Sequence, residues 1–292
     1  MQLRHEPRDP SCFPNWRFPT LDFDYDPASR SAWMSFKADG PPCFTFQMLN
    51  DLADVRESLR ALFADDAIKR YPIHYVALAS NKPGVFNLGG DLAMFARSIR
   101  NGERERLRAY AHACIDVIYG MVAAYNLPVV TLAVIAGQAL GGGLESALAQ
   151  DVLFADERAA LGVPEIAFNT FPGMGAVTLL TRRIGAARAE KVITGGEAHS
   201  AQQMFDLGVV DRIAPAGAVK TTALAWMAEG GEIGRRRRLA IMQARRTCFP
   251  VALSALIGIV DVWTDCSCDV TSRDLRHMDR LVAAQKKKSV AA

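Results

Sequence analysis

The sequence lacks a hydrophobic run long enough to cross a membrane. Half of its 292 residues are hydrophobic, but the longest apolar stretches, such as residues 127–136, are much shorter than the roughly 20 residues that a spanning helix needs. The first sixteen residues are polar, contain three prolines and include no apolar core of a secretory signal. We therefore expect no membrane span, no secretion and a location in the cytoplasm.

An excess of charge of either sign is also missing. The 34 lysines and arginines nearly balance the 31 acidic residues, so the chain has no global field that would attract nucleic acid or a membrane surface. Partners must therefore be sought in local patches.

Patterns for metal, disulfide and hydrolase chemistry are equally scarce. The six cysteines are scattered, and the closest pair, Cys266 and Cys268, is too tightly spaced for a zinc knuckle and lacks a nearby histidine. This favours free thiols in a reducing compartment and no metal site. The five histidines lie far apart and no Gly-x-Ser-x-Gly elbow is present, which argues against a serine-hydrolase triad. No nucleotide-binding glycine fingerprint occurs, and no cofactor is predicted.

What is present is an alternation of strand-like and helix-like segments. Apolar periodicity predicts strands at residues 21–25, 32–37, 75–79, 129–134, 152–155 and 209–213, and helices at 49–64, 104–125, 143–150, 176–184, 188–194 and 201–207. This pattern predicts an α/β core over residues 21–217 with right-handed crossovers. Residues 1–20 are predicted to be a loosely ordered lead-in. Residues 218–292 show no strand-like run and are predicted to be a helical portion packed on the core or on a neighbouring subunit.

Two glycine-rich corners follow predicted strands and open predicted helices. They are Phe86-Asn-Leu-Gly-Gly-Asp91 and Gly137-Gln-Ala-Leu-Gly-Gly-Gly-Leu-Glu145. Unsatisfied amides at a helix N-terminus bind anionic oxygen, and glycine allows a ligand to approach closely. Taken alone, each loop is better explained by tight packing. Two such corners that converge on one point would form an oxyanion hole.

Two carboxylates stand alone among apolar residues. Glu145 opens an otherwise apolar helix, and Glu165 follows it by 20 residues in another apolar segment. Helix-dipole stabilisation or capping explains either one separately, but together they indicate an acid/base pair whose pKa values are tuned by burial. Met174, in the turn Phe171-Pro-Gly-Met-Gly-Ala176, is either core filler or the wall of an acyl pocket.

These motifs together resemble the enoyl-CoA hydratase/isomerase, or crotonase, superfamily. The resemblance rests on the two glycine corners, on Gly162-Val-Pro-Glu165, and on Thr194-Gly195 followed by Ala201 and Gly208-Val-Val210. It implies a crotonase (ClpP/crotonase-like) fold, a spiral of ββα repeats with a C-terminal helical portion, assembled as a homotrimer or hexamer. It also implies that Glu145 and Glu165 are catalytic.

Within the superfamily the chain is most similar to bacterial diffusible signal factor (DSF) synthases. This likeness rests on three sequence motifs: Phe86-Asn-Leu-Gly-Gly-Asp-Leu92, the Phe-Pro-Gly-Met-Gly turn, and Met278-Asp-Arg-Leu-Val282 with Gln285. It implies dehydration of a 3-hydroxyacyl chain on acyl carrier protein to a cis-2-enoyl thioester, followed by thioester hydrolysis, for quorum sensing. The amides of Gly90 and Gly142 would form the oxyanion hole. Met174, Trp263 and Leu281 would line the acyl pocket, although the last two also suit a plain core.

Three alternatives stay open at this point. The arginine run at residues 235–238, with Arg245 and Arg246 behind it, is either a solvated helix face or a docking site for acyl carrier protein. The enzyme could instead be an ordinary enoyl-CoA hydratase or isomerase on CoA esters. A regulatory scaffold that binds a cognate sensor kinase is the third possibility, but a scaffold alone has no need of two buried glutamates.

Overall fold

The structure is a computed structural model that describes the backbone of residues 13–290 and the side chains of residues 13–283. The described strands are Leu21–Asp26 (β1), Ser31–Phe36 (β2), Tyr75–Ser80 (β3), Val85–Asn87 (β4), Val130–Ile135 (β5), Gln138–Leu140 (β6), Val152–Asp156 (β7), Ala160–Gly162 (β8), Ala198–Ser200 (β9) and Arg212–Ala214 (β10). The α-helices are Phe46–Ala64 (α1), Ala67–Arg70 (α2), Leu92–Arg100 (α3), Arg104–Val122 (α4), Gly142–Leu148 (α5), Ala176–Ile184 (α6), Ala186–Gly195 (α7), Ala201–Asp206 (α8), Val219–Ala228 (α9), Gly231–Cys248 (α10), Leu253–Cys268 (α11) and Ser272–Val290 (α12). Two short 3₁₀ helices are Ala124–Asn126 (η1) and Pro164–Phe168 (η2).

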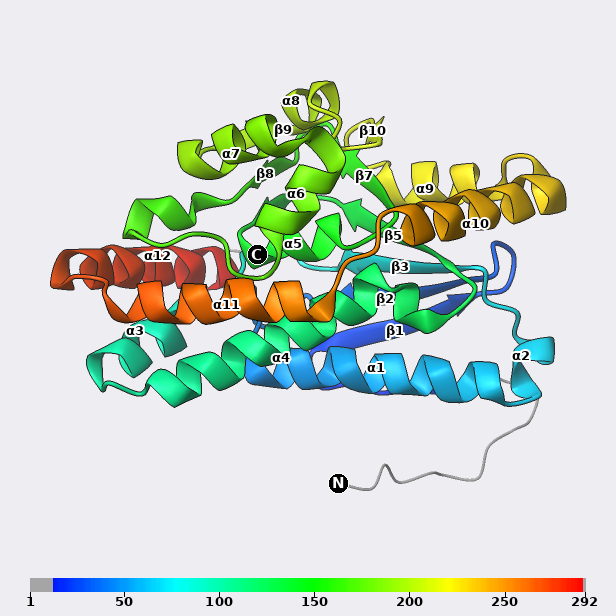
Figure 1. Cartoon of the computed structure of the whole chain (residues 1–292). Helices are drawn as coiled ribbons and strands as arrows, with labels where there is room; N and C mark the ends of the chain where they lie inside the picture. Colours follow the sequence, from blue (N-terminus) through cyan, green and yellow to red (C-terminus); the bar gives the residue numbers. More distant parts are fainter. Residues whose placement is uncertain (1–12, 291–292) are drawn as a thin grey trace.

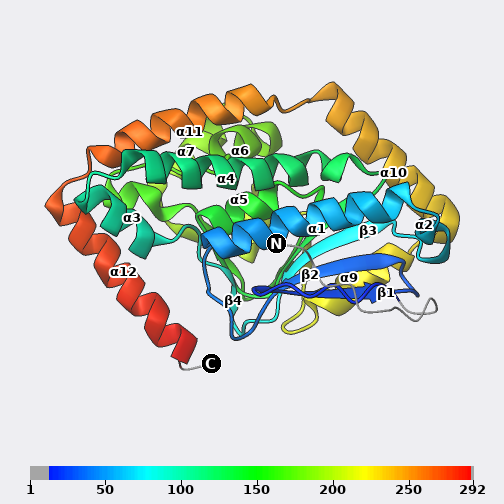
Figure 2. The ribbon, with the colours of Figure 1, turned by 90° about the horizontal axis from the view of Figure 1, so that it is seen from below.

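A large sheet with strand order β1-β2-β3-β5-β7-β10 forms the centre of the molecule (Figure 1). All neighbouring pairs are parallel except β1 with β2. Successive residues of a strand point to opposite faces of the sheet and so enter two different hydrophobic cores. Trp33 faces α9, whereas the adjacent Met34 lies in the core beneath α1 and α4. Figure 2 shows α1 and α9 on opposite sides of β2 and β3. Helices on both faces explain why the central strands are mostly apolar on both of their sides.

A second, smaller sheet has the order β4-β6-β8-β9. Each of β3, β5 and β7 in the large sheet is followed by a short strand of the small sheet and then by a helical segment. This arrangement confirms the predicted spiral of ββα repeats. Because the short strands have only three residues each, they leave no periodic signal in the sequence, and they were not predicted.

One predicted strand is wrong in its extent. Residues 209–213 were predicted to pair, but β10 begins at Arg212. The amides of Val209 and Val210 both donate to the carbonyl of Met204 at the end of α8, so they close that helix instead of joining the sheet. The two valines are buried, which produced the apolar signal.

Part of the predicted N-terminal lead-in packs against the core. Phe13 stacks on Tyr25 with 4.7 Å between ring centroids, and Phe18 is buried. The Thr20 amide and hydroxyl both donate to the buried carboxylate of Asp51 in α1. The segment that begins at Phe13 is therefore fixed to the domain, while residues 1–12 lie outside the described part of the chain.

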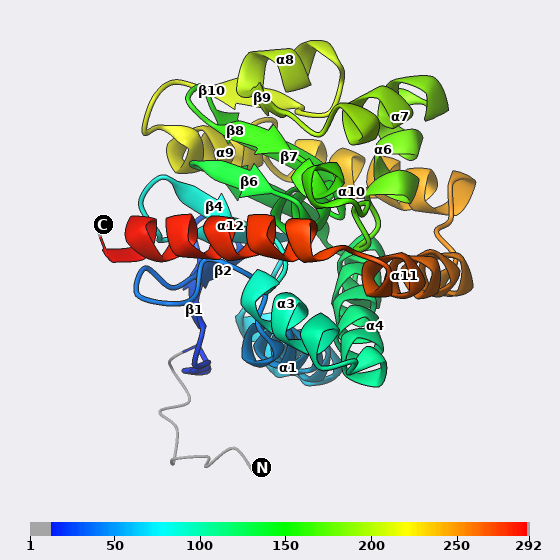
Figure 3. The same cartoon turned by 90° about the vertical axis from the view of Figure 1, so that its left-hand side faces the viewer.

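The C-terminal portion is helical, as predicted. Helix α11 packs along α4, and α12 contacts α3 and η2, crossing in front of the smaller sheet in Figure 3. Arg108 and His112 of α4 both bind Asp261 of α11, at 3.1 and 2.9 Å. In the described residues no single helix is long and apolar enough to span a membrane; α10 and α11 meet that criterion only as a pair, bent by 65°.

The arginines of α10 are largely engaged within the chain. Arg245 and Arg246 bind the buried carboxylate of Asp151, which follows α5. Arg238 lies over the ring of Trp226, 4.3 Å from its centroid. Three of the arginines predicted to form a solvated or docking face therefore fasten α10 to the core.

Candidate active site

One cavity brings together all seven residues that the sequence singled out. It encloses about 170 Å³. Its lining includes the predicted residues Gly90, Gly142, Glu145, Glu165, Met174, Trp263 and Leu281. They come from five separate stretches of the chain, so their convergence is a property of the fold.

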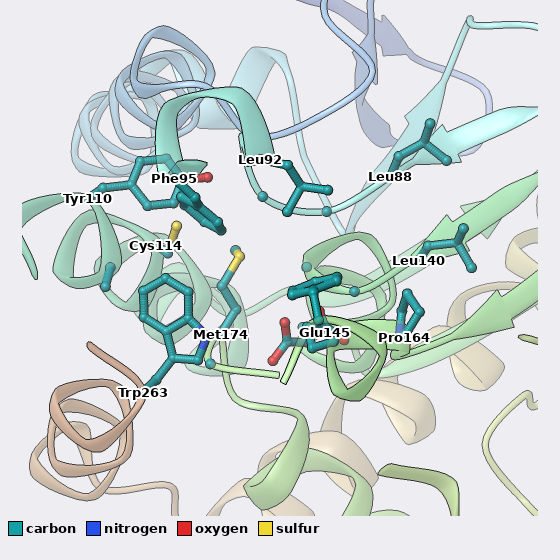
Figure 4. A pocket seen from close by; sticks show the side chains of 18 of the residues that line it. Leu88, Leu92, Phe95, Tyr110, Cys114, Leu140, Glu145, Pro164, Met174 and Trp263 are labelled. Carbon is teal, nitrogen blue, oxygen red and sulfur yellow. The ribbon is translucent and has the colours of Figure 1, made fainter. Parts of the chain in front are cut away.

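The two ends of the cavity are lined by different residues. In Figure 4, Phe95, Tyr110, Cys114 and Trp263 lie at one end, and Leu88, Leu140 and Pro164 lie at the other. Glu145 and Met174 lie between the two ends. The lining is mostly apolar, and its polar groups include the two carboxylates, the glycine amides, Gln138 and Tyr110. This is the usual composition of a small-molecule site.

The first glycine corner leaves a single amide unengaged. The Leu88 amide donates to the Pro42 carbonyl, the Gly89 amide to Oδ1 of Asn87, and the Asp91 amide to the Tyr110 hydroxyl. Among the described groups, the Gly90 amide has no acceptor. An isolated donor on the cavity wall is suited to bind an oxygen that gains negative charge.

The second corner begins α5 and touches the first. A Cβ on Gly89 would come within 3.1 Å of the Gly142 nitrogen, so the two corners are in backbone contact. Gly141 has φ +52°, a conformation that glycine adopts without strain, and it turns the chain from β6 into α5. The Gly142 amide, at the first position of α5, is also without an acceptor in the described residues. The predicted pair of amides therefore lies at one place.

Glu145 is held by the start of another helix. Its Oε1 accepts a hydrogen bond of 2.9 Å from the amide of Ala176, the first residue of α6. The side chain is 1% exposed. Burial raises the pKa of Glu145 to about 7, against the lowering effect of the Ala176 and Met174 amides.

Glu165 has a different environment. Its Oε1 lies beside Gly141, where a Cβ would approach within 2.4 Å. Its Oε2 is buried and has no hydrogen-bond partner among the described residues. Burial, and secondly the negative charge of Glu145, raise the pKa of Glu165 well above its ordinary value. Burial therefore disfavours ionisation of both carboxyls; amide donors oppose this pKa shift at Glu145, whereas the charge of Glu145 adds to it at Glu165.

The apolar wall contains the predicted Trp263 and also residues that the sequence did not single out. Trp263 packs against Gly173, where a Cβ would come within 2.6 Å of its ring, and it meets one of the unpredicted residues, Phe95, edge-on at 5.2 Å. Tyr110 and Cys114 also reach the cavity from α4. Their spacing of four residues on a predicted helix was the available signal, but core packing explains that spacing equally well.

A cavity of this kind can stabilise an oxyanion and move protons beside it. The two free amides face the same space as both carboxylates. No group of three His, Cys, Asp or Glu side chains in the described part of the chain could hold a metal ion. Cys43, Cys114, Cys248, Cys266 and Cys268 are free thiols, and Cys12 lies outside the described residues.

Comparison with known proteins shows the family to which the chain belongs. The model of the enoyl-CoA hydratase/isomerase family matches residues 47–247. The chain belongs to the enoyl-CoA hydratase/isomerase family. Members of this family are typically enzymes, among them hydratases and other lyases, and isomerases.

Curated members of the family are similar over part of the chain. The peroxisomal fatty acid beta-oxidation multifunctional protein MFP2 of Arabidopsis thaliana is 30% identical over 184 residues, which are 63% of this chain and 24% of that protein. The probable enoyl-CoA hydratase echA8 of Mycobacterium tuberculosis is 43% identical over 107 residues, 37% of this chain and 41% of that protein. The chain thus matches less than half the length of these relatives.

Solved structures of the family share the fold. Human mitochondrial delta3-delta2-enoyl-CoA isomerase superposes with a TM-score of 0.71 at 20% identity, covering 92% of this chain and 99% of that one. DspI of Pseudomonas aeruginosa superposes with a TM-score of 0.63 at 24% identity, covering 80% of this chain and 84% of that one. The family model ends before Trp263 and Leu281, so the family match leaves the α11 and α12 wall unassigned.

Proposed function

We propose that this chain is a DSF-type signal synthase, which makes a cis-2-unsaturated fatty acid from a 3-hydroxyacyl group on acyl carrier protein. The observation that carries the proposal is the asymmetry of the two buried carboxylates beside two free amides. Glu145 is hydrogen-bonded by an amide, and Glu165 Oε2 has no partner among the described residues. The motifs that resemble signal synthases supply the substrate and product.

The first step is dehydration. The thioester oxygen binds the Gly90 and Gly142 amides, which stabilise the enolate that forms when the C2 proton leaves. Glu145 is the base that accepts this proton, because hydrogen bonds from amides favour its ionised form. Glu165, whose pKa burial and the charge of Glu145 raise well above its ordinary value, is the acid that donates a proton to the departing C3 hydroxyl. The products are the cis-2-enoyl thioester and one water.

The second step is hydrolysis of the thioester. A carboxylate of the same pair removes a proton from water, whose oxygen attacks the thioester carbon to form a tetrahedral intermediate; when this intermediate collapses, the C–S bond breaks and the carboxyl returns the proton to the departing sulfur. The amides again stabilise the negative oxygen of the tetrahedral intermediate. The free acid and the thiol of the carrier are released, and the water consumed equals the water formed in the first step.

The acyl chain lies in the apolar part of the cavity. Met174, Trp263 and Leu281 offer the apolar surface, and Phe95 and Tyr110 extend it. The thioester and its carrier enter from the side of Leu88, Leu140 and Pro164. Assembly as a trimer or hexamer and contact with a sensor kinase belong to the same proposal.

The test supplies one 3-hydroxyacyl chain on acyl carrier protein and on coenzyme A in parallel reactions. Mass spectrometry and double-bond analysis identify the products. Release of a cis-2-enoic acid from the carrier-bound substrate is expected. Turnover of the CoA ester alone, with a trans product and no free acid, would overturn the proposal.

That opposing result describes the second candidate, an enoyl-CoA hydratase. The specific observation in its favour is the 43% identity over 107 residues to a probable enoyl-CoA hydratase. The same glutamates and amides would serve this reaction, so only the carrier, the double-bond geometry and the released acid separate the two candidates.

A further inference from the structure

The oxyanion corner at Gly90 is held from outside the glycine loop by a buried tyrosine. Tyr110, in α4, is 1% exposed. Its hydroxyl donates to the carbonyl of Phe44 at 2.5 Å and accepts from the amide of Asp91 at 3.3 Å. One hydroxyl thus joins the segment before α1 to the residue that follows Gly90.

Phe44 completes this connection. Its amide donates to the carbonyl of Gly89 at 2.8 Å, so the Phe44 backbone binds the loop directly and through Tyr110. Its ring also lies against the second corner, since a Cβ on Gly142 would come within 3.3 Å of the Phe44 ring. Phe44 therefore contacts both amide corners, and it is fully buried.

The same contacts explain which amide faces the cavity. Protein acceptors engage the amides of Leu88, Gly89 and Asp91, and the Gly90 amide has no acceptor in the described structure. The hydroxyl of Tyr110 supplies the last of these acceptors. Without it, the part-buried Asp91 amide would lose this hydrogen bond, which costs free energy, and the backbone pairing of Phe44 with Gly90 would have to hold the loop alone.

We propose that Tyr110 is a positioning residue: its hydroxyl, acting through Phe44 and Asp91, aims the Gly90 amide at the thioester oxygen. The inference deepens the proposed function and depends on it for the reaction that is measured. Among the described contacts, the Tyr110 hydroxyl is not hydrogen-bonded to Glu145 or Glu165. It acts by fixing the direction of the Gly90 amide. Such direction matters because oxyanion donors act only when preorganised at the position where charge develops.

The test compares Tyr110→Phe with Tyr75→Phe. The control removes another buried hydroxyl that donates to a carbonyl, that of Met227, on the opposite face of the sheet and away from the cavity. Because displacement of an oxyanion donor weakens the stabilisation of the transition state more than that of the ground state, Tyr110→Phe should lower kcat about tenfold and change KM less than about twofold. Tyr75→Phe should leave both constants unchanged. Equal kcat for Tyr110→Phe and the wild type, or equal losses in both variants, would overturn the positioning role.

A second measurement needs neither a variant nor the reaction. Amide-resolved hydrogen exchange of the wild-type protein should show the Asp91 amide exchanging about tenfold or more slowly than the Gly90 amide, because only the former is hydrogen-bonded. Exchange of Asp91 as fast as Gly90 would overturn the inference even if Tyr110→Phe fails to fold. An inactive wild-type enzyme would refute the proposed function instead, while the exchange rates would still test the hydrogen bond of the Asp91 amide on which the positioning role depends.

Discussion

Glu145 accepts a hydrogen bond from the amide of Ala176 at 2.9 Å, at the first turn of α6. Glu165 has no comparable donor at its buried Oε2 among the described residues. Because an amide donor and the positive end of a helix favour a carboxylate, the two glutamates differ in their readiness to lose a proton. This difference is the basis for the proposed roles of Glu145 as base and Glu165 as acid, which the sequence left open.

The first prediction tests these roles with Glu145→Gln and Glu165→Gln. Each should lower product formation by about 10²- to 10⁴-fold, the usual cost of losing a general acid or base. In D₂O, Glu165→Gln should still exchange the C2 hydrogen of the bound substrate, because its base is intact. Glu145→Gln should not. The exposed Glu190→Gln is the control, and exchange in Glu145→Gln but not in Glu165→Gln would reverse the assignment.

The second prediction concerns the pH dependence of activity. The reactive state needs Glu145 ionised and Glu165 protonated, so kcat/KM should rise as the pH increases through about 7, the raised pKa of Glu145. It should fall again at higher pH, when Glu165 loses its proton. Steady-state rates from pH 5 to 10 measure the profile. The residual activity of Glu165→Gln should lack the upper limb, and an unchanged upper limb in that variant would assign it to another group.

The third prediction concerns stability. The pKa of Glu145 is raised from 4.5 to about 7, so the folded state binds more protons than the unfolded state between these pH values. The contribution of Glu145 to the unfolding free energy should therefore be fully present below pH 4.5 and be lost, by about 3 kcal/mol, as the pH rises to 7 and above. Denaturant titrations at pH 5 and 8 measure this change. Glu145→Gln should lose less stability over the same interval, and identical losses would show that Glu145 is not buried as described.

The fourth prediction concerns the acyl wall. Trp263→Ala enlarges the cavity and should shift products to longer chains, because an apolar pocket discriminates by about 1 to 3 kcal/mol per methylene. Gly173→Ala should act in the opposite direction, since its Cβ would lie within 2.6 Å of the Trp263 ring and push it. Product lengths are read by mass spectrometry. Leu256→Ala, a buried deletion on α11 that does not line the cavity, should leave the profile unchanged.

Much of the fold could be predicted from local pattern. The buried central strands β3, β5 and β7 are apolar because helices cover both faces of the sheet, and this continuous apolarity is visible in the chain. The three-residue strands β4, β6 and β8 were missed because their stability comes from pairing with one another. The predicted strand at residues 209–213 was misplaced because burial of Val209 and Val210 resembles strand pairing when only composition is considered.

The sequence by itself determined the chemical groups: two isolated glutamates, two glycine corners and the family they resemble. It could not determine that Trp263 and Leu281 approach Gly90 and Glu145, because such contacts depend on how α11 and α12 pack against α4 and α3. Nor could it distinguish the two glutamates. Burial raises the pKa of both, but the Ala176 and Met174 amides oppose the shift at Glu145, whereas the charge of Glu145 adds to it at Glu165. These contacts, like the free Gly90 and Gly142 amides, depend on which groups tertiary packing brings together.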